Sequence, residues 1–207
     1  MHIELIEMLR CPEEHAEEYL VLSTSEMNGR MVWLGLVGCP ICHREFEIIE
    51  GIVDFTEVVT GERQARSVRR TPAPDSPIEA DAQSLQALLE LGGPGGFVIL
   101  QGSAARHAVG LASLMGGIHF VGINAPPDVS ELPILSLIQT DHMIPLRGSM
   151  ARGVVVGAEL GHSLWVAEAL RVLLRGRRLV VESEQPRLPD GVTQLAAGQG
   201  LWVGEKR

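Results

Sequence analysis

Apolar residues form short continuous runs in the second half of the chain, and these runs alternate with helical patterns. The predicted strands are 96–101, 118–123, 134–138, 154–156 and 179–181, and the predicted helices are 104–115 and 163–174. Such alternation is typical of a doubly wound parallel sheet. The tail, 191–207, predicts two strands that turn at Gly198–Gly200 and form an antiparallel hairpin at the sheet edge.

The first 60 residues carry a different pattern. Four apolar positions between residues 3 and 9 are spaced for one face of a short helix, and strand-like runs follow at 31–37 and 45–49. A unit of this size with few large apolar side chains has a marginal core, for which a structural metal is a common remedy. We therefore predict a small domain at 1–60, a linker at 61–80 and an α/β domain at 81–207.

The linker prediction rests on three prolines and four arginines that interrupt all apolar periodicity. A coil of about 20 residues spans about 25 Å, so the two units can dock, within one chain or across a homodimer, which we slightly prefer. We interpret Arg63, Arg66, Arg69 and Arg70 as a solvated tether, because no aromatic residue among them can stack on a base.

Charge is unevenly distributed along the chain. Residues 1–60 hold three arginines against 12 acidic residues, a net charge of −9, whereas residues 61–207 hold 14 of each sign. Because nucleic-acid affinity comes mainly from Lys and Arg, the acidic first unit argues against nucleic acid as a partner. No apolar run reaches the roughly 18 residues of a membrane helix and the start lacks a secretory pattern, so we expect a cytoplasmic protein without a membrane partner.

All three cysteines lie in the first unit. Cys39 and Cys42 form a Cys-x-x-Cys pair, and Cys11 with His15 forms a second pair at a spacing that zinc sites use. This pattern predicts one structural zinc ion with four ligands. Buried thiols, or a redox pair at Cys39 and Cys42, are the alternatives, but nothing resembling a thioredoxin unit surrounds the pair.

The motifs IEMLRCP (6–12), Cys39–Cys42 and FEIIEGIVDF (46–55) resemble the small zinc-ribbon proteins that activate RNA- and protein-modifying methyltransferases. The resemblance covers about residues 2–56 and implies a structural metal and a protein partner. In the family pattern a second cysteine follows the first after three positions, where this chain has Glu14. His15 is our choice of fourth ligand, with Glu14 and His43 as rivals, and some bacterial relatives lack the metal.

The second unit resembles class I S-adenosylmethionine-dependent methyltransferases from about Leu88 onward. The motifs that carry the resemblance are the run 168–179 (EALRVLLRGRRL) and the run 140–146 (TDHMIPL), which is similar to the family's acidic segment beside the adenine. In that family a glycine-rich turn after the first strand lets the backbone approach the methionine part of the cofactor, and an acid after the second strand holds the ribose.

Most of these binding residues are missing here. The turn after the first predicted strand keeps only Gly102, the ribose position holds Asn124, and Asp141 matches the acidic segment. Asparagine lacks the charge-assisted grip of a carboxylate on a diol. The short connections at 125–133 and 183–191 also leave thin pocket walls. We expect no S-adenosylmethionine binding tighter than about 0.1 mM at this degenerate site.

The sequence therefore favours a non-catalytic binding or regulatory protein, a pseudoenzyme without catalytic residues. We interpret Arg106, His107, His142 and His162 as surface or capping residues. The alternative is an active methyltransferase that is stabilised by its own fused ribbon. A third reading is a homodimeric structural protein that uses its exposed sheet edges.

Overall fold

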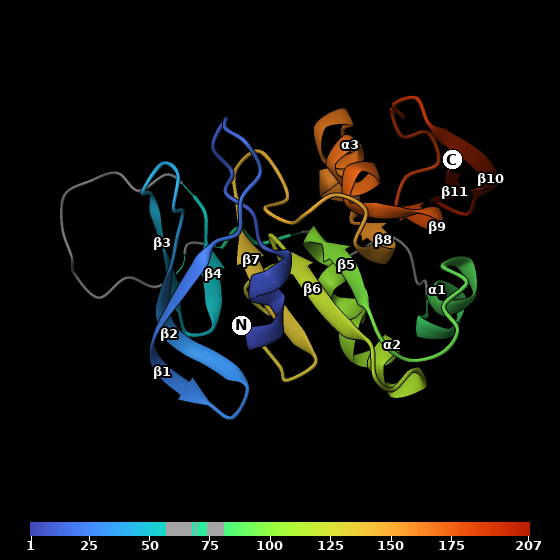
Figure 1. Ribbon diagram of the computed structural model, residues 1–207. Helices are drawn as coiled ribbons and strands as arrows, with labels where there is room; N and C mark the ends of the chain where they lie inside the picture. The colour runs from blue at the N-terminus through green and yellow to red at the C-terminus, as the bar shows by residue number, and fades with distance from the viewer. Residues whose placement is uncertain (57–67, 69, 74–80) are drawn as a thin grey trace.

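The computed structural model describes residues 1–56, 68, 70–73 and 81–207. Most of the predicted linker, with Arg63, Arg66 and Arg69, lies outside these residues. One sheet of 11 strands runs through the described chain, in the order β1-β2-β3-β4-β7-β6-β5-β8-β9-β11-β10 (Figure 1). The N-terminal and C-terminal strands lie at its two opposite ends.

The elements have the following bounds. The strands are β1 (Val21–Asn28), β2 (Met31–Gly38), β3 (Glu45–Ile49), β4 (Ile52–Asp54), β5 (Phe97–Gln101), β6 (His119–Ile123), β7 (Leu135–Gln139), β8 (Ala151–Val156), β9 (Leu173–Val181), β10 (Val192–Gly198) and β11 (Leu201–Lys206). The α-helices are α1 (Ala82–Leu88), α2 (Ala108–Leu114) and α3 (Ser163–Val172). The 3-10 helices are η1 (Ile3–Met8), η2 (Gly102–His107) and η3 (Ala158–Leu160).

The five central strands, β7, β6, β5, β8 and β9, are parallel neighbours. Numbered along the chain from β5, they run 3-2-1-4-5, which is the order of a doubly wound sheet. β11 pairs antiparallel with β9, and β10 pairs antiparallel with β11. The fold is thus α/β, with a truncated Rossmann-like, doubly wound sheet that ends in the predicted hairpin.

The N-terminal unit is continuous with this sheet. Strands β1 to β4 form an antiparallel meander, and β4 then pairs in parallel with β7, with Val53 opposite Ile138. The two units therefore dock within one chain, through main-chain hydrogen bonds as well as side chains. A homodimer stays a prediction.

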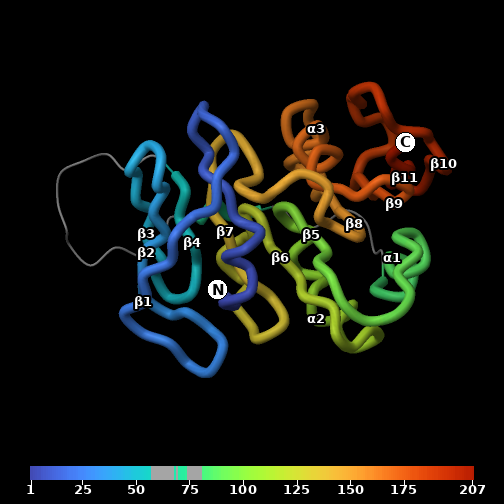
Figure 2. Tube along the Cα trace, in the orientation of Figure 1, coloured from blue at the N-terminus to red at the C-terminus, as the bar shows by residue number. Residues whose placement is uncertain are grey.

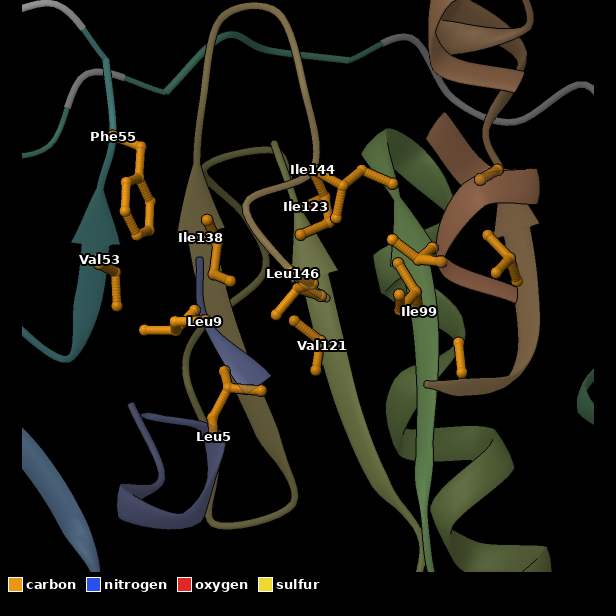
Figure 3. Close-up of a cluster of buried hydrophobic side chains, with 14 of the residues drawn as sticks. Leu5, Leu9, Val53, Phe55, Ile99, Val121, Ile123, Ile138, Ile144 and Leu146 are labelled. Carbon is orange, nitrogen blue, oxygen red and sulfur yellow. The ribbon is translucent and has the colours of Figure 1, made fainter. Parts of the chain in front are cut away.

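Two hydrophobic clusters cover the two faces of the sheet. Helices α1 and α2 pack on one face, and η1 and α3 pack on the other. The connection from β7 to β8, residues 140–150, contains no helix and packs on the second face, so it leaves part of that face uncovered. Leu5 and Leu9 of the N-terminal segment fill this space against Val121, Ile138 and Leu146 (Figure 3). Figure 2 follows that segment, in dark blue, across β7 and β6.

Some elements differ from the prediction. The predicted helix 104–115 is a 3-10 turn followed by α2, because Gly102, with φ of 58°, turns the chain tightly at the end of β5. β9 begins at Leu173, directly after α3, and not at 179. Strand β1 and helix α1 have no counterpart in the prediction. No helix in the described part of the chain is long and apolar enough to cross a membrane.

Candidate functional site

The four predicted metal ligands come together at the tip of the N-terminal unit. Cys39 and Cys42 lie in the turn between β2 and β3, where the backbone N–H of Cys39 donates to Arg44 O at 2.9 Å. Cys11 and His15 lie on the loop that follows η1. The ligand atoms of all four residues lie within 4.8 Å of one another.

The distances in this cluster fit a tetrahedral zinc ion. Zn–S bonds of about 2.3 Å and Zn–N bonds of about 2.0 Å place two sulfurs about 3.8 Å apart and a sulfur and a nitrogen about 3.5 Å apart. The Sγ atoms of Cys11 and Cys42 are 3.6 Å apart, and Cys39 Sγ lies 3.3 Å from His15 Nε2. The donor set, three sulfurs and one imidazole, is one that structural zinc sites use.

A carbonyl orients the imidazole for this role. His15 Nδ1 lies 2.7 Å from the carbonyl oxygen of Ala16, so Nδ1 carries the proton and donates it. Nε2 then faces Cys39 with its lone pair. Metal-binding histidines usually have such a backbone partner on the second nitrogen.

The thiols differ in how readily they ionise. Burial raises the pKa of Cys11 to about 12. Burial also opposes ionisation of Cys39, but hydrogen bonds from the backbone of Cys42 and Ile41 outweigh it and lower the pKa of this thiol to about 7. Three thiolates this close repel one another, and a divalent cation removes that repulsion. Cys11, His15, Cys39 and Cys42 could therefore hold a metal ion, and neither Glu14 nor His43 belongs to the cluster in the described chain.

A second site lies at the carboxyl ends of the parallel strands, where doubly wound folds bind ligands. A cavity of about 480 Å³ opens there. Its lining consists of Thr56, Thr71, Pro72, Ala73, Asn124, Gln139, Thr140, Asp141, Glu159 and Leu160. Two of the three residues predicted for the degenerate cofactor site, Asn124 and Asp141, thus share one cavity wall.

Asn124 has a structural role in this wall. It adopts a positive φ of 52° directly after β6. Its side-chain Oδ1 accepts a hydrogen bond of 2.9 Å from the backbone N–H of Thr140. The amide oxygen at the predicted ribose position is therefore engaged with the end of the neighbouring strand β7.

Gly102, the third predicted residue, is next to a carboxylate of the same chain. Glu159, on η3 after β8, accepts a hydrogen bond of 2.5 Å from Ser103 N and one of 2.8 Å from Ser103 Oγ. A Cβ atom at position 102 would clash with Glu159 Oε1, and one at Gly157 would clash with Ser103 Oγ. The glycine turn after β5 therefore accommodates the Glu159 carboxylate closely.

Three features of this region were missed or misread in the sequence. Glu159 was missed, and the acid between two nearby glycines, Gly157 and Gly161, was its only signal. Arg70, interpreted as part of a solvated tether, donates from Nε to Ala125 O at 3.0 Å and also contacts Pro126 O. Gln101 at the end of β5 is fully buried, and neither polar atom of its amide has a hydrogen-bond partner in the described chain.

The scattered histidines and Arg106 do not form a catalytic constellation among the described residues. Arg106 pairs with Asp128 at 2.8 Å. His107 lies 3.5 Å from the buried carboxylate of Glu182. His162 precedes α3 with its ring edge-on to Trp165.

No protein-family model and no curated protein matches this sequence. Among solved structures, the chain is similar to a complex between the Haloferax volcanii Trm112 methyltransferase activator and a methyltransferase, at 16% identity and a TM-score of 0.37. It is also similar to a methyltransferase from an antibiotic biosynthesis pathway of Anabaena variabilis (15%, 0.38) and to one from Bacillus halodurans (17%, 0.38).

These matches are partial. They cover 48%, 51% and 52% of this chain and 50%, 45% and 53% of the respective matched chains. This chain thus spans about half the length of these three structures. The fold class rests on the strand order and register described above.

Proposed function

We propose that this protein is a non-catalytic binding or regulatory protein, built from a zinc-stabilised N-terminal unit and a methyltransferase-like sheet that has lost cofactor binding. The observation that carries the proposal is the position of Glu159. Its carboxylate accepts hydrogen bonds from the backbone N–H and the hydroxyl of Ser103. This is the turn where the resemblance predicts the methionine part of the cofactor.

A cofactor approaching this turn must first displace the carboxylate. Hydrogen bonds to a charged group contribute about 1.5–3 kcal/mol, so the displacement lowers affinity by about tenfold or more. Ser103 is buried, and its donors would need a new acceptor in the same place. The incoming carboxylate of a methionine moiety would also meet the negative charge of Glu159.

The ribose position adds a second cost. Asn124 offers one amide that already accepts from Thr140 N, in place of a free carboxylate. Breaking that bond would release the end of β7. Both features support a dissociation constant for S-adenosylmethionine weaker than about 0.1 mM, or less than about 5.5 kcal/mol of binding free energy.

The N-terminal unit supports the regulatory part of the proposal. Its resemblance to activating subunits concerns a family that works through protein contacts, and its candidate metal site has four protein ligands and no open position for a reacting water. Zinc, if bound, supplies folding energy here and no chemistry. Cys11, His15, Cys39 and Cys42 would hold it.

Equilibrium dialysis of the full chain against labelled S-adenosylmethionine tests this function. We expect no saturable binding at ligand concentrations up to about 0.1 mM. Glu184→Ala, which removes an exposed carboxylate that accepts from Gly200 N, should behave like the wild type. Saturation in the micromolar range would reject the proposal.

An active methyltransferase is the second candidate, and the cavity favours it. About 480 Å³ lined by amides, hydroxyls and two carboxylates can accommodate a ligand of nucleoside size. This candidate requires Glu159 to swing away when the cofactor enters. Micromolar binding together with a methylated product would establish it.

A further inference from the structure

One short segment, Met143–Arg147, lies between the candidate metal site and the cavity, and we call it the strap. Its outer edge is bonded to the N-terminal segment. The N–H of Arg10 donates to Pro145 O at 3.0 Å, and the N–H of Arg147 donates to Met8 O at 2.9 Å. Leu9 and Leu146 form the antiparallel bridge between these two bonds.

The strap is also bonded to the loop that carries two of the candidate ligands. Arg10 and Tyr19 form a bridge that closes the loop 11–18, which contains Cys11 and His15. The Arg147 guanidinium donates to Tyr19 Oη at 2.7 Å, and its carbon lies 4.3 Å from the centre of the Tyr19 ring. Both ends of this loop therefore contact the strap.

The opposite edge of the strap is bonded to helix α3. Glu168 accepts from Ile144 N at 2.8 Å. Arg171 donates to Ile144 O at 2.6 Å and to Leu146 O at 2.8 Å. The ion pair between Glu168 and Arg171, at 2.8 Å, holds the two side chains in this arrangement. The strap thus has a rigid attachment on one side and the metal-site loop on the other.

The beginning of the strap continues directly into the cavity wall. Met143 O accepts from Thr140 Oγ1 at 2.8 Å. Thr140 and Asp141 line the cavity, and Thr140 N donates to Asn124 at a second wall position. A displacement of the strap would therefore move the hydrogen bonds that hold Thr140 against Asn124.

We propose that the strap couples the two sites, so that metal binding at Cys11, His15, Cys39 and Cys42 fixes the cavity wall at Thr140 and Asp141. Loop 11–18 forms no helix or strand. Its ion pairs, from Glu13 to Arg44 and from Glu17 to Arg10 and Arg147, lie at the surface and contribute little, so without the metal the loop opens locally at low free-energy cost. Because the residues that flank the loop, Arg10 and Tyr19, are hydrogen-bonded to the strap, opening of the loop loosens the strap. This inference rests on the metal part of the proposed function and makes the metal a regulator of the cavity.

Hydrogen exchange of the full chain, zinc-loaded and after chelation, tests the coupling. We expect peptides covering 140–147 to exchange at least about tenfold faster after chelation, a change of about 1.4 kcal/mol in local opening. Peptides from β5 and β8 should change little. Strap exchange that stays constant while loop 11–18 accelerates would overturn the coupling, and so would equal acceleration of all peptides. Elemental analysis of the same sample reports separately whether a metal is bound at all.

A variant tests the coupling with the metal in place. Arg147→Ala removes the contacts to Tyr19 and Glu17, whereas Arg152→Ala removes a half-buried arginine that donates to the Gly92–Gly95 carbonyls, away from the strap. We expect Arg147→Ala to retain its zinc and to exchange faster at 143–147, with no such change in Arg152→Ala. Equal strap exchange in the two variants would contradict the role of Arg147.

Discussion

The candidate metal site joins two short stretches of the chain, and 24 positions separate His15 from Cys39. Cys-x-x-Cys pairs form tight turns, so Cys39 and Cys42 were predictable from local geometry alone. The choice of His15 over Glu14 was less certain in the sequence. The structure brings His15 to 3.3 Å from Cys39 because Nδ1 is bonded to Ala16 O. No residue type or spacing in the sequence indicates such a hydrogen bond to the backbone.

Glu159 shows what the sequence could not predict. Its partner Ser103 is 56 positions earlier in the chain, and the contact depends on how η3 turns after β8. The sequence did show that Gly102 stands alone in a turn that the family fills with glycines. It could not show that a side chain of the same protein occupies the space beside that glycine.

A double-mutant cycle tests the contact between Gly102 and Glu159. Gly102→Ala should destabilise the protein by about 2 kcal/mol or more, because its Cβ clashes with Glu159 Oε1 at a positive φ. Removal of the carboxylate in Glu159→Ala should recover part of that loss in the double variant. Chemical unfolding gives the free energy of unfolding of the two single variants and the double variant.

The control for this cycle is Gly116→Ala, where a Cβ meets nothing within 4 Å. Its stability should stay within about 0.5 kcal/mol of the wild type. Strict additivity of the Gly102 and Glu159 substitutions would show that the two residues do not share a contact.

His119 gives the protein a specific pH dependence. Burial, followed by the charge of His2, lowers the pKa of His119 to about 4, whereas the unfolded chain has the ordinary value of about 6.5. The unfolded state therefore binds the proton first, and stability falls as pH decreases from about 6.5 to about 4. Between pH 7 and pH 5, titration of this group should lower the free energy of unfolding by about 2 kcal/mol.

His119→Gln should remove that part of the pH dependence, because glutamine does not titrate. The measurement is urea unfolding of both proteins at pH 7 and pH 5. His142→Gln, at an exposed position, is the control and should retain the wild-type slope. An identical slope in wild type and His119→Gln would contradict the assignment.

At the scale of elements, the buried parallel strands were the most predictable part. Their apolar runs are continuous because helices or other segments cover both faces. β1 (VLSTSEMN) was missed because it is an edge strand whose residues are mostly exposed, so it has no strong apolar pattern. α1 was missed because it is only seven residues long, although Asp81 caps it by accepting from Ser84 N at 2.6 Å.

The lack of a helix between β6 and β7 was predictable from length. The cover of the opposite face, which the helix-free connection from β7 to β8 leaves exposed, was not predictable. The N-terminal segment covers the exposed face, with Leu5 and Leu9 fully buried. Leu5→Ala should therefore lower the free energy of unfolding of the full chain by about 2–5 kcal/mol. Leu34→Ala, at a side chain that is 37% exposed, should cost less than about 1 kcal/mol. Thermal unfolding that leaves Leu5→Ala unchanged would show that η1 is not part of the common core.

At the scale of the whole molecule, the sequence predicted two units and the structure joins them in one sheet. The parallel pairing of β4 with β7 follows from register between distant strands, which a single sequence does not reveal. The division at 1–60, 61–80 and 81–207 remains a proposal about folding units. The acidic charge of the first unit does not bear on this pairing, because main-chain bonds and apolar contacts form it.

Metal content is the test of the N-terminal unit. We expect about one zinc per chain by elemental analysis, and loss of zinc in Cys42→Ser with a fall in melting temperature of about 10 °C or more. His43→Ala, at the rival ligand outside the cluster, should retain the metal. A folded, metal-free wild type would reject the zinc assignment.

Calorimetric titration of S-adenosylmethionine into the zinc-loaded full chain and into Glu159→Ala tests the central claim most directly. For the wild type, we expect no saturable heat up to about 0.1 mM cofactor. Any gain in binding should be confined to the Glu159 variant, in which the turn after β5 is free. A wild-type dissociation constant in the micromolar range would contradict the claim that Glu159 blocks the cofactor position, and it would establish a functional cofactor pocket.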